Sequence, residues 1–187
     1  GSKDILINNT IFENNIVADN NGILYSSSTS NRNVIIENTT FRGNTGKLGI
    51  VYVNKAVTVK DSKFINNNNL NSVGGAIREC DDLTVTNSTF IGNKAGRDSG
   101  AINVGYNRKA TITHSTFINN TAGNGYHGDV ISNSGKLTIN YCVLVSNADH
   151  SIIYSSSEDK VDAQYNWWGT NDNPKSLNGV GTYEDDY

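Results

Sequence analysis

The sequence lacks the residues and motifs that mark most metal-binding, redox and membrane-spanning proteins. Its 187 residues include no Met, one Pro and two Cys, and they contain no CxxC, HExxH or Asp-rich calcium loop. The absence of these motifs argues against the common redox, zinc and calcium sites, so we expect no cofactor. No apolar stretch reaches the roughly 20 residues of a transmembrane helix, and no signal peptide is evident.

A strong charge of one sign is lacking as well. There are 15 basic and 18 acidic residues, the formal net charge is −3, and neither sign forms a long run. Nucleic acids and anionic membranes are usually bound through basic patches. We therefore expect no nucleic-acid partner and no membrane insertion by this chain.

Asn, with 30 residues, is abundant, and much of it belongs to a repeat. The eleven-residue motif LTVTNSTFIGN at 83–93 has near-copies at 5–15, 34–44, 57–67, 110–120, 137–147 and 161–171, and successive copies are 23 to 29 residues apart. Self-similarity at such a period is the signature of a repeat protein. The eighth motif position holds Phe12, Phe41, Phe64, Phe90, Phe117, Leu144 and Trp168, and the eleventh holds Asn15, Asn44, Asn67, Asn93, Asn120, Asn147 and Asn171.

The hydrophobic pattern predicts short strands in each repeat. The first and third motif positions are apolar and the second is usually polar, which is typical of a strand with one buried face. A second apolar segment follows most copies, and we expect its third residue, always Leu, Val or Ile, to point inward. These segments lie at 22–25, 49–52, 75–78, 100–103, 128–131 and 151–154.

These strands predict an all-β fold, a right-handed parallel β-helix (β-solenoid) of about seven rungs, where a rung is one circuit of 23–29 residues. Asn tolerates left-handed backbone, so we expect a turn at the eleventh position, and stacked amides can hydrogen-bond along the column.

Cys80 and Cys142 fall about two rungs apart, too far for a disulfide, so we expect free, buried thiols.

The repeat also sets the domain boundaries. We assign residues 1–2 to an expression scar, 3–174 to the β-helix and 175–187 to a C-terminal tail or the start of a linker. Because the first rung begins almost at the terminus without a cap, we expect the chain to be part of a longer protein.

The motifs resemble those of two groups of surface proteins. The pair FxxN and GGAI, as in FIGN (90–93), FINN (117–120) and GGAI (74–77), resembles the repeats of chlamydial polymorphic membrane proteins. YNWWGTNDNP (165–174) is similar to the segment that closes β-helix regions in adhesin-like surface proteins of methanogenic archaea. The resemblance implies a secreted, cell-surface, parallel β-helix used for attachment to other cells, to matrix or to glycans, with surface proteins as further partners.

The residue after the inward aliphatic of the second strand forms a candidate binding column. If the aliphatic points inward, this residue faces solvent, where Tyr can stack on a sugar ring and Arg and Asn can hydrogen-bond to it. The alternative is that Tyr occurs there because it favours strands. The column contains Tyr25, Tyr52, Arg78, Asn103, Ile131 and Tyr154.

Two further groups have both a functional and a structural interpretation. His127 and His150 precede their second strands at equivalent places, with Asp129 and Asp149 nearby, which is a weak zinc candidate. Solvated loop residues are the simpler interpretation, and we assign no metal.

Trp167 and Trp168 most simply cover the open end of the core, and ligand stacking is the alternative.

Polysaccharide lyases and hydrolases also use β-helices, so an enzyme is the main alternative to attachment. Glycoside hydrolysis needs two carboxyl groups roughly 5–10 Å apart, and we find no column with carboxylates on neighbouring rungs. We therefore expect no enzymatic activity, and a passive stalk is the third possibility. The acidic residues considered are Glu37, Asp61 and Asp162 in separate columns, and the turn clusters Glu79, Asp81, Asp82 and Glu158, Asp159, Asp162.

Overall fold

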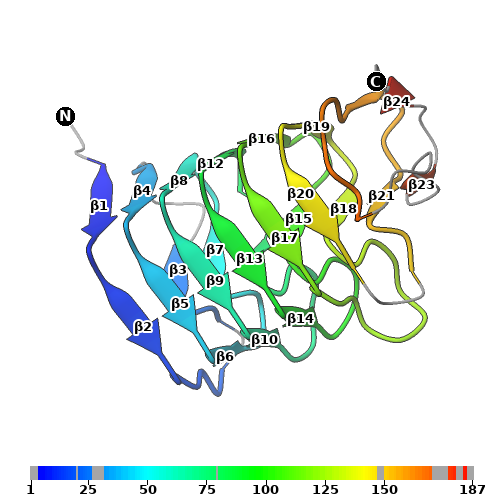
Figure 1. Ribbon diagram of the computed structural model, residues 1–187. Helices are drawn as coiled ribbons and strands as arrows, with labels where there is room; N and C mark the ends of the chain where they lie inside the picture. Colours follow the sequence, from blue (N-terminus) through cyan, green and yellow to red (C-terminus); the bar gives the residue numbers. More distant parts are fainter. Residues whose placement is uncertain are drawn as a thin grey trace.

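The computed structural model describes residues 4–19, 21–26, 32–78, 80–146 and 150–169, together with the backbone of 177–179 and 183–184. Short strands wind into a coil, and equivalent strands of successive circuits pair in parallel to form stacked sheets (Figure 1). The predicted all-β parallel β-solenoid is confirmed. In the described residues no helix has the length and hydropathy of a membrane span.

Two sheets are built by the repeat motif itself. Sheet A is formed by β1 (Ile5–Asn8), β4 (Val34–Glu37), β8 (Val57–Lys60), β12 (Asp82–Thr86), β16 (Lys109–Thr113), β19 (Lys136–Asn140), β22 (Val161–Asp162) and β24 (Tyr183–Glu184). Sheet B is formed by β2 (Ile11–Glu13), β5 (Thr40–Arg42), β9 (Lys63–Ile65), β13 (Thr89–Ile91), β17 (Thr116–Ile118) and β20 (Val143–Val145). The seven motif copies supply the first seven strands of sheet A in sequence order.

The segments between motifs form the other sheets. Sheet D contains β3 (Leu24–Ser26), β7 (Val51–Val53), β11 (Ile77–Arg78), β15 (Ile102–Val104), β18 (Ile131–Asn133), β21 (Ile153–Ser155) and β23 (Leu177–Gly179). The small sheet C contains β6 (Thr45–Gly46), β10 (Asn68–Asn69) and β14 (Lys94–Ala95). Residues 175–187, predicted as a tail or linker, contribute β23 and β24, which pair with β21 and β22.

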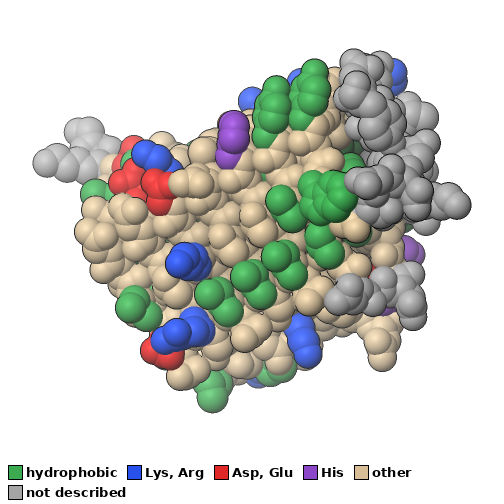
Figure 2. All heavy atoms as spheres, viewed as in Figure 1, with side chains coloured by type: hydrophobic (Ala, Val, Ile, Leu, Met, Phe, Trp, Pro, Cys, Tyr) green, Lys and Arg blue, Asp and Glu red, His purple; other side chains and the backbone are tan. Residues whose placement is uncertain are grey.

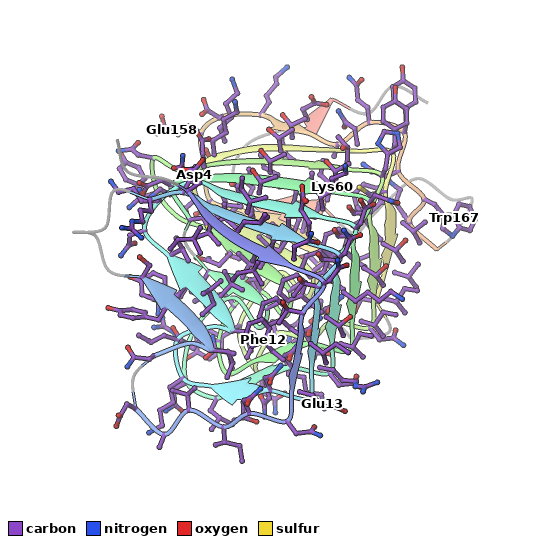
Figure 3. All side chains as sticks on the ribbon, turned by 90° about the vertical axis from the view of Figure 1, so that its left-hand side faces the viewer. Asp4, Phe12, Glu13, Lys60, Glu158 and Trp167 are labelled. Atoms are coloured by element: carbon purple, nitrogen blue, oxygen red, sulfur yellow. The ribbon has the colours of Figure 1, made fainter. Side chains whose placement is uncertain are left out.

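In the core, side chains from the same motif position stack on one another from rung to rung. Val57 and Val59 are buried and the intervening Thr58 is exposed, as the period-two pattern predicted. The Phe column is in register from Phe12 to Leu144, and neighbouring rings are stacked with centroids 4.7 to 4.8 Å apart. In Figure 3, which looks along the coil, Phe12 lies in its interior. Trp168 is buried as well, beside the bridge between Val143 and Trp167.

The Asn column forms a hydrogen-bonded ladder, as predicted. Each side-chain amide donates to the side-chain oxygen of the next rung, at 2.9 Å from Asn15 to Asn44, 3.0 Å from Asn44 to Asn67, and 2.9 Å from Asn67 to Asn93 and from Asn93 to Asn120. Asn44, Asn67, Asn93 and Asn120 are fully buried. Asn147 and Asn171 lie outside the described residues.

The predicted turn at the ladder position is displaced by one residue. The left-handed backbone lies at the preceding residue, which is Asn14, Gly43, Asn66, Gly92 or Asn119. The ladder Asn must point its side chain inward to bond its neighbours, so the residue before it takes the turn. A second left-handed column, which the sequence did not indicate, joins sheets A and B at Asn9, Asn38, Asp61, Asn87, His114, Tyr141 and Tyr165.

The second strand is shifted by one residue in one rung. Ile131, predicted to face outward, pairs with Ile102 and Ile153 and is fully buried, so Ser132 takes its place in the outward column. In the sequence, the second apolar segments 75–78, 100–103 and 128–131 each begin with Gly, so the pattern predicts that Gly128 is equivalent to Gly75 and Gly100. In the structure Gly128 has positive φ, as Gly74 and Ser99 do, because the turn before this strand requires left-handed backbone.

Candidate functional site

The predicted binding column on the outer face of sheet D is present in part. Tyr25 is 46% exposed, and its ring lies 5.6 Å from that of Tyr52. The Arg78 guanidinium lies 4.9 Å from the centre of the Tyr52 ring, within range of a cation–π interaction. Arg78 also donates to the Ser72 hydroxyl at 2.8 Å. Tyr25, Tyr52 and Arg78 therefore form one series of contacting side chains on this face.

The column does not continue along the whole face. Asn103 is only 9% exposed and Ser132 is buried, so the middle of the column offers little to a ligand. Tyr154 lies beyond this break, where its ring stacks on His127 at 4.5 Å. The single exposed column expected from the sequence is thus divided into two groups.

The two His residues contact different carboxylates. The His127 backbone N–H donates to Asp98 at 2.9 Å, and its ring Nδ1 lies 3.5 Å from the same oxygen. His150 Nδ1 lies 3.2 Å from Oδ1 of the fully buried Asp129. Asp129 also accepts from the Ala122 N–H at 3.1 Å and the Ser146 hydroxyl at 3.3 Å. The described residues contain no group of three His, Cys, Asp or Glu suited to a metal ion, and Asp149 lies outside them.

Cys80 and Cys142 are free and buried, as predicted. Cys142 occupies the motif position held elsewhere by Ser62, Ser88 and Ser115, and its sulfur accepts a hydrogen bond from the Ser115 N–H at 3.4 Å. Burial raises the pKa of the Cys142 thiol to about 11, against the opposing effect of that hydrogen bond.

This pKa predicts a pH dependence of stability. Between pH 9 and 11 the unfolded chain loses the Cys142 proton while the folded chain keeps it, so the free energy of unfolding should fall with rising pH, by about 2 kcal/mol. Stability below pH 9 should be unaffected. Urea unfolding at pH 8 and pH 11 measures the change. Cys142→Ser, which keeps the hydrogen-bonding column, should lose this part of the pH dependence, and an equal fall in both proteins would contradict the assignment.

A concavity lies at the corner where strands of sheet D end and those of sheet A begin. It is a groove of about 880 Å³. Figure 3 shows Glu158 at this corner of the coil, on the same side of the coil as Asp4. The lining residues are Asp81, Asp82, Tyr106, Asn107, Arg108, Lys109, Ser134, Gly135, Lys136, Ser156, Ser157, Glu158 and Asp159.

The groove brings together carboxylates that the sequence assigned to separate solvated turns. Asp81 and Asp82 lie at the start of β12 on one rung, and Glu158 and Asp159 precede β22 on another, yet all four line the groove. Glu79 lies outside the described residues. The expectation that no column places acidic residues on neighbouring rungs is also wrong, because the backbone of Asp162 is in register with that of Glu184. That pair includes β24, a strand that the sequence did not predict.

An aromatic surface at the corner between sheets A and B was not predicted, and Figure 2 shows hydrophobic side chains gathered on this face of the molecule. The His114 and Tyr141 rings stack at 5.3 Å, and Tyr141 stacks on Tyr165 at 5.0 Å. Trp167, expected to help cover the core, is 46% exposed at the edge of sheet B, where it forms a β-bridge with Val143. The sequence does contain an indication of this surface. The fifth motif position holds Asn or Asp in the first four copies, and His or Tyr in the last three.

Comparison with known families identifies the architecture. The family model for a right-handed β-helix region matches residues 1–167, which include six complete motif copies and most of the seventh. Neither the curated proteins nor the solved structures give a match.

Proposed function

Since the chain belongs to the family defined by a right-handed β-helix region, we propose that it is a non-catalytic attachment module of an adhesin-like, extracellular surface protein. Its partners would be other cells, recognised through their glycans or surface proteins. The resemblance of its repeats to those of chlamydial and methanogen surface proteins supports this proposal.

The observation that carries the proposal is the contact series on sheet D. Tyr25, Tyr52 and Arg78 stand on successive strands in register, and the sheet fixes their spacing at the distance between neighbouring strands, about 4.8 Å. Aromatic rings offer apolar faces and hydroxyl groups together, and a rigid backbone lowers the entropy cost of binding. Such a surface is suited to recognition rather than to bond cleavage.

Attachment of the purified protein to cells tests the proposal. Replacing Tyr25, Tyr52 and Tyr154 with Ala should weaken attachment about tenfold or more, because each ring contributes roughly 1 kcal/mol. Tyr141→Ala, which removes an exposed ring from another face, should leave attachment unchanged. A wild-type protein that attaches to nothing would instead favour a passive stalk.

One observation favours a second function, that of a polysaccharide-active enzyme. The corner groove contains four carboxylates, and acid–base chemistry on sugars requires such groups. Release of reducing sugar or of unsaturated product from polysaccharides, abolished by Glu158→Gln or Asp82→Asn, would support it. The attachment proposal expects no product.

A further inference from the structure

The corner groove runs along the axis of the coil. Its lining residues come from four successive rungs at the ends of the D strands and the starts of the A strands. Asp82, Lys109 and Lys136 hold the same position on β12, β16 and β19, in register. Because neighbouring strands are about 4.8 Å apart, four rungs give a groove roughly 15 Å long. This shape fits a linear chain better than a compact ligand.

The charges of the groove alternate along its length. Asp81 and Asp82 lie at one end, Arg108, Lys109 and Lys136 in the middle, and Glu158 and Asp159 at the other end. Arg108 forms a salt bridge with Asp81. A polyanion would meet carboxylates at both ends and a polycation would meet three cations in the middle, so neither has a complementary surface. The groove therefore suits a neutral chain.

The polar side chains of the groove offer both hydrogen-bond acceptors and hydrogen-bond donors to the hydroxyl groups of a ligand. Carboxylates accept hydrogen bonds from hydroxyls, and ammonium and guanidinium groups donate to them. The Ser134 and Ser156 hydroxyls lie 2.9 Å apart on neighbouring rungs, and either can donate. A hydroxyl-rich ligand would therefore find donors and acceptors throughout the groove, whereas an apolar ligand would leave them unpaired.

One side chain of the groove offers an apolar surface. Tyr106 is 78% exposed, and its ring makes no hydrogen bond or ring contact with the described residues. Exposure of a large ring next to a polar groove carries no packing benefit for the fold. The ring can cover the apolar C–H face of a sugar.

We propose that this groove binds a neutral, linear oligosaccharide that lies along the axis of the coil, with one sugar ring stacked on Tyr106. The proposal goes beyond the attachment function, because it assigns a ligand class to a corner of the coil other than the face that bears Tyr25 and Tyr52.

Binding to an array of linear tetrasaccharides, with neutral, sulfated and uronate members, tests the proposal. The wild-type protein should bind neutral members, and Tyr106→Ala should bind them about tenfold more weakly. Tyr106→Phe keeps the ring and should restore most of the affinity. Equal melting temperatures of the three proteins would show that each is folded, as expected for an exposed side chain.

The outcomes separate this proposal from the attachment function. Binding only to sulfated or uronate members, undiminished binding by Tyr106→Ala, or no binding to any tetrasaccharide would overturn the groove assignment. The triple variant at Tyr25, Tyr52 and Tyr154 should keep its tetrasaccharide binding. If Tyr106→Ala still attaches to cells while the triple variant does not, attachment stands without the groove. If the wild type binds tetrasaccharides but attaches to no cell, the groove stands without the attachment function.

Discussion

Replacing Phe90 with Ala is expected to lower the free energy of unfolding by about 4 kcal/mol. The Phe90 ring is fully buried and stacked between Phe64 at 4.8 Å and Phe117 at 4.7 Å. Its removal leaves a cavity between two rings that the strand register holds in place, so the neighbours cannot close it. Urea unfolding followed by circular dichroism measures the loss.

Phe12 is the matched control for Phe90. It occupies the same column, but it is only partly buried, and its ring stacks on the single neighbour Phe41 at 4.7 Å. Phe12→Ala should therefore cost about 1–2 kcal/mol, since less apolar surface is lost from the core. Equal losses at both positions would mean that the rings do not form one continuous column.

Replacing Asn93 with Ala should be at least as damaging, with an expected loss of roughly 4 kcal/mol. The Asn93 side chain donates to the Phe64 carbonyl and to Asn120, and it accepts from the backbone and side-chain amides of Asn67. All of these groups are buried, and each one left without a partner costs about 1–3 kcal/mol. Chemical denaturation measures this loss as well.

Asn15 provides the corresponding control in the Asn ladder. It is exposed and ends the ladder, where its backbone and side-chain amides donate to Asn44. Asn15→Ala should cost less than about 1 kcal/mol, because water can replace what is lost. A small effect at Asn93 would show instead that the ladder adds no stability.

The core was predictable because every rung repeats it. Phe41, Phe64, Phe90 and Phe117 recur at one motif position, so a single alignment places all of them on one axis, and the same holds for the Asn ladder. Period-two alternation then distinguishes buried Val59 from exposed Thr58. In a solenoid, position within the repeat determines position in space.

Two of the errors lie where the repeat changes length. The segment before β18 differs in length from its neighbours, so alignment on glycine placed Ile131 outside, whereas backbone conformation at Gly128 sets the register. The corner groove was missed for the same reason. Its residues belong to connections of unequal length, and only the winding of the coil brings Asp82 and Glu158 into one groove.

The account depends on parallel winding in register, and distances between nitroxide labels test this most directly. Thr58, Thr84, Thr111 and Thr138 occupy one outward column on successive strands of sheet A. Labelled pairs that begin at Thr58 should show backbone separations that grow by about 4.8 Å per rung, to roughly 14 Å at Thr138. Separations that do not rise in equal steps along this series would contradict the winding, the columns and the groove built on it.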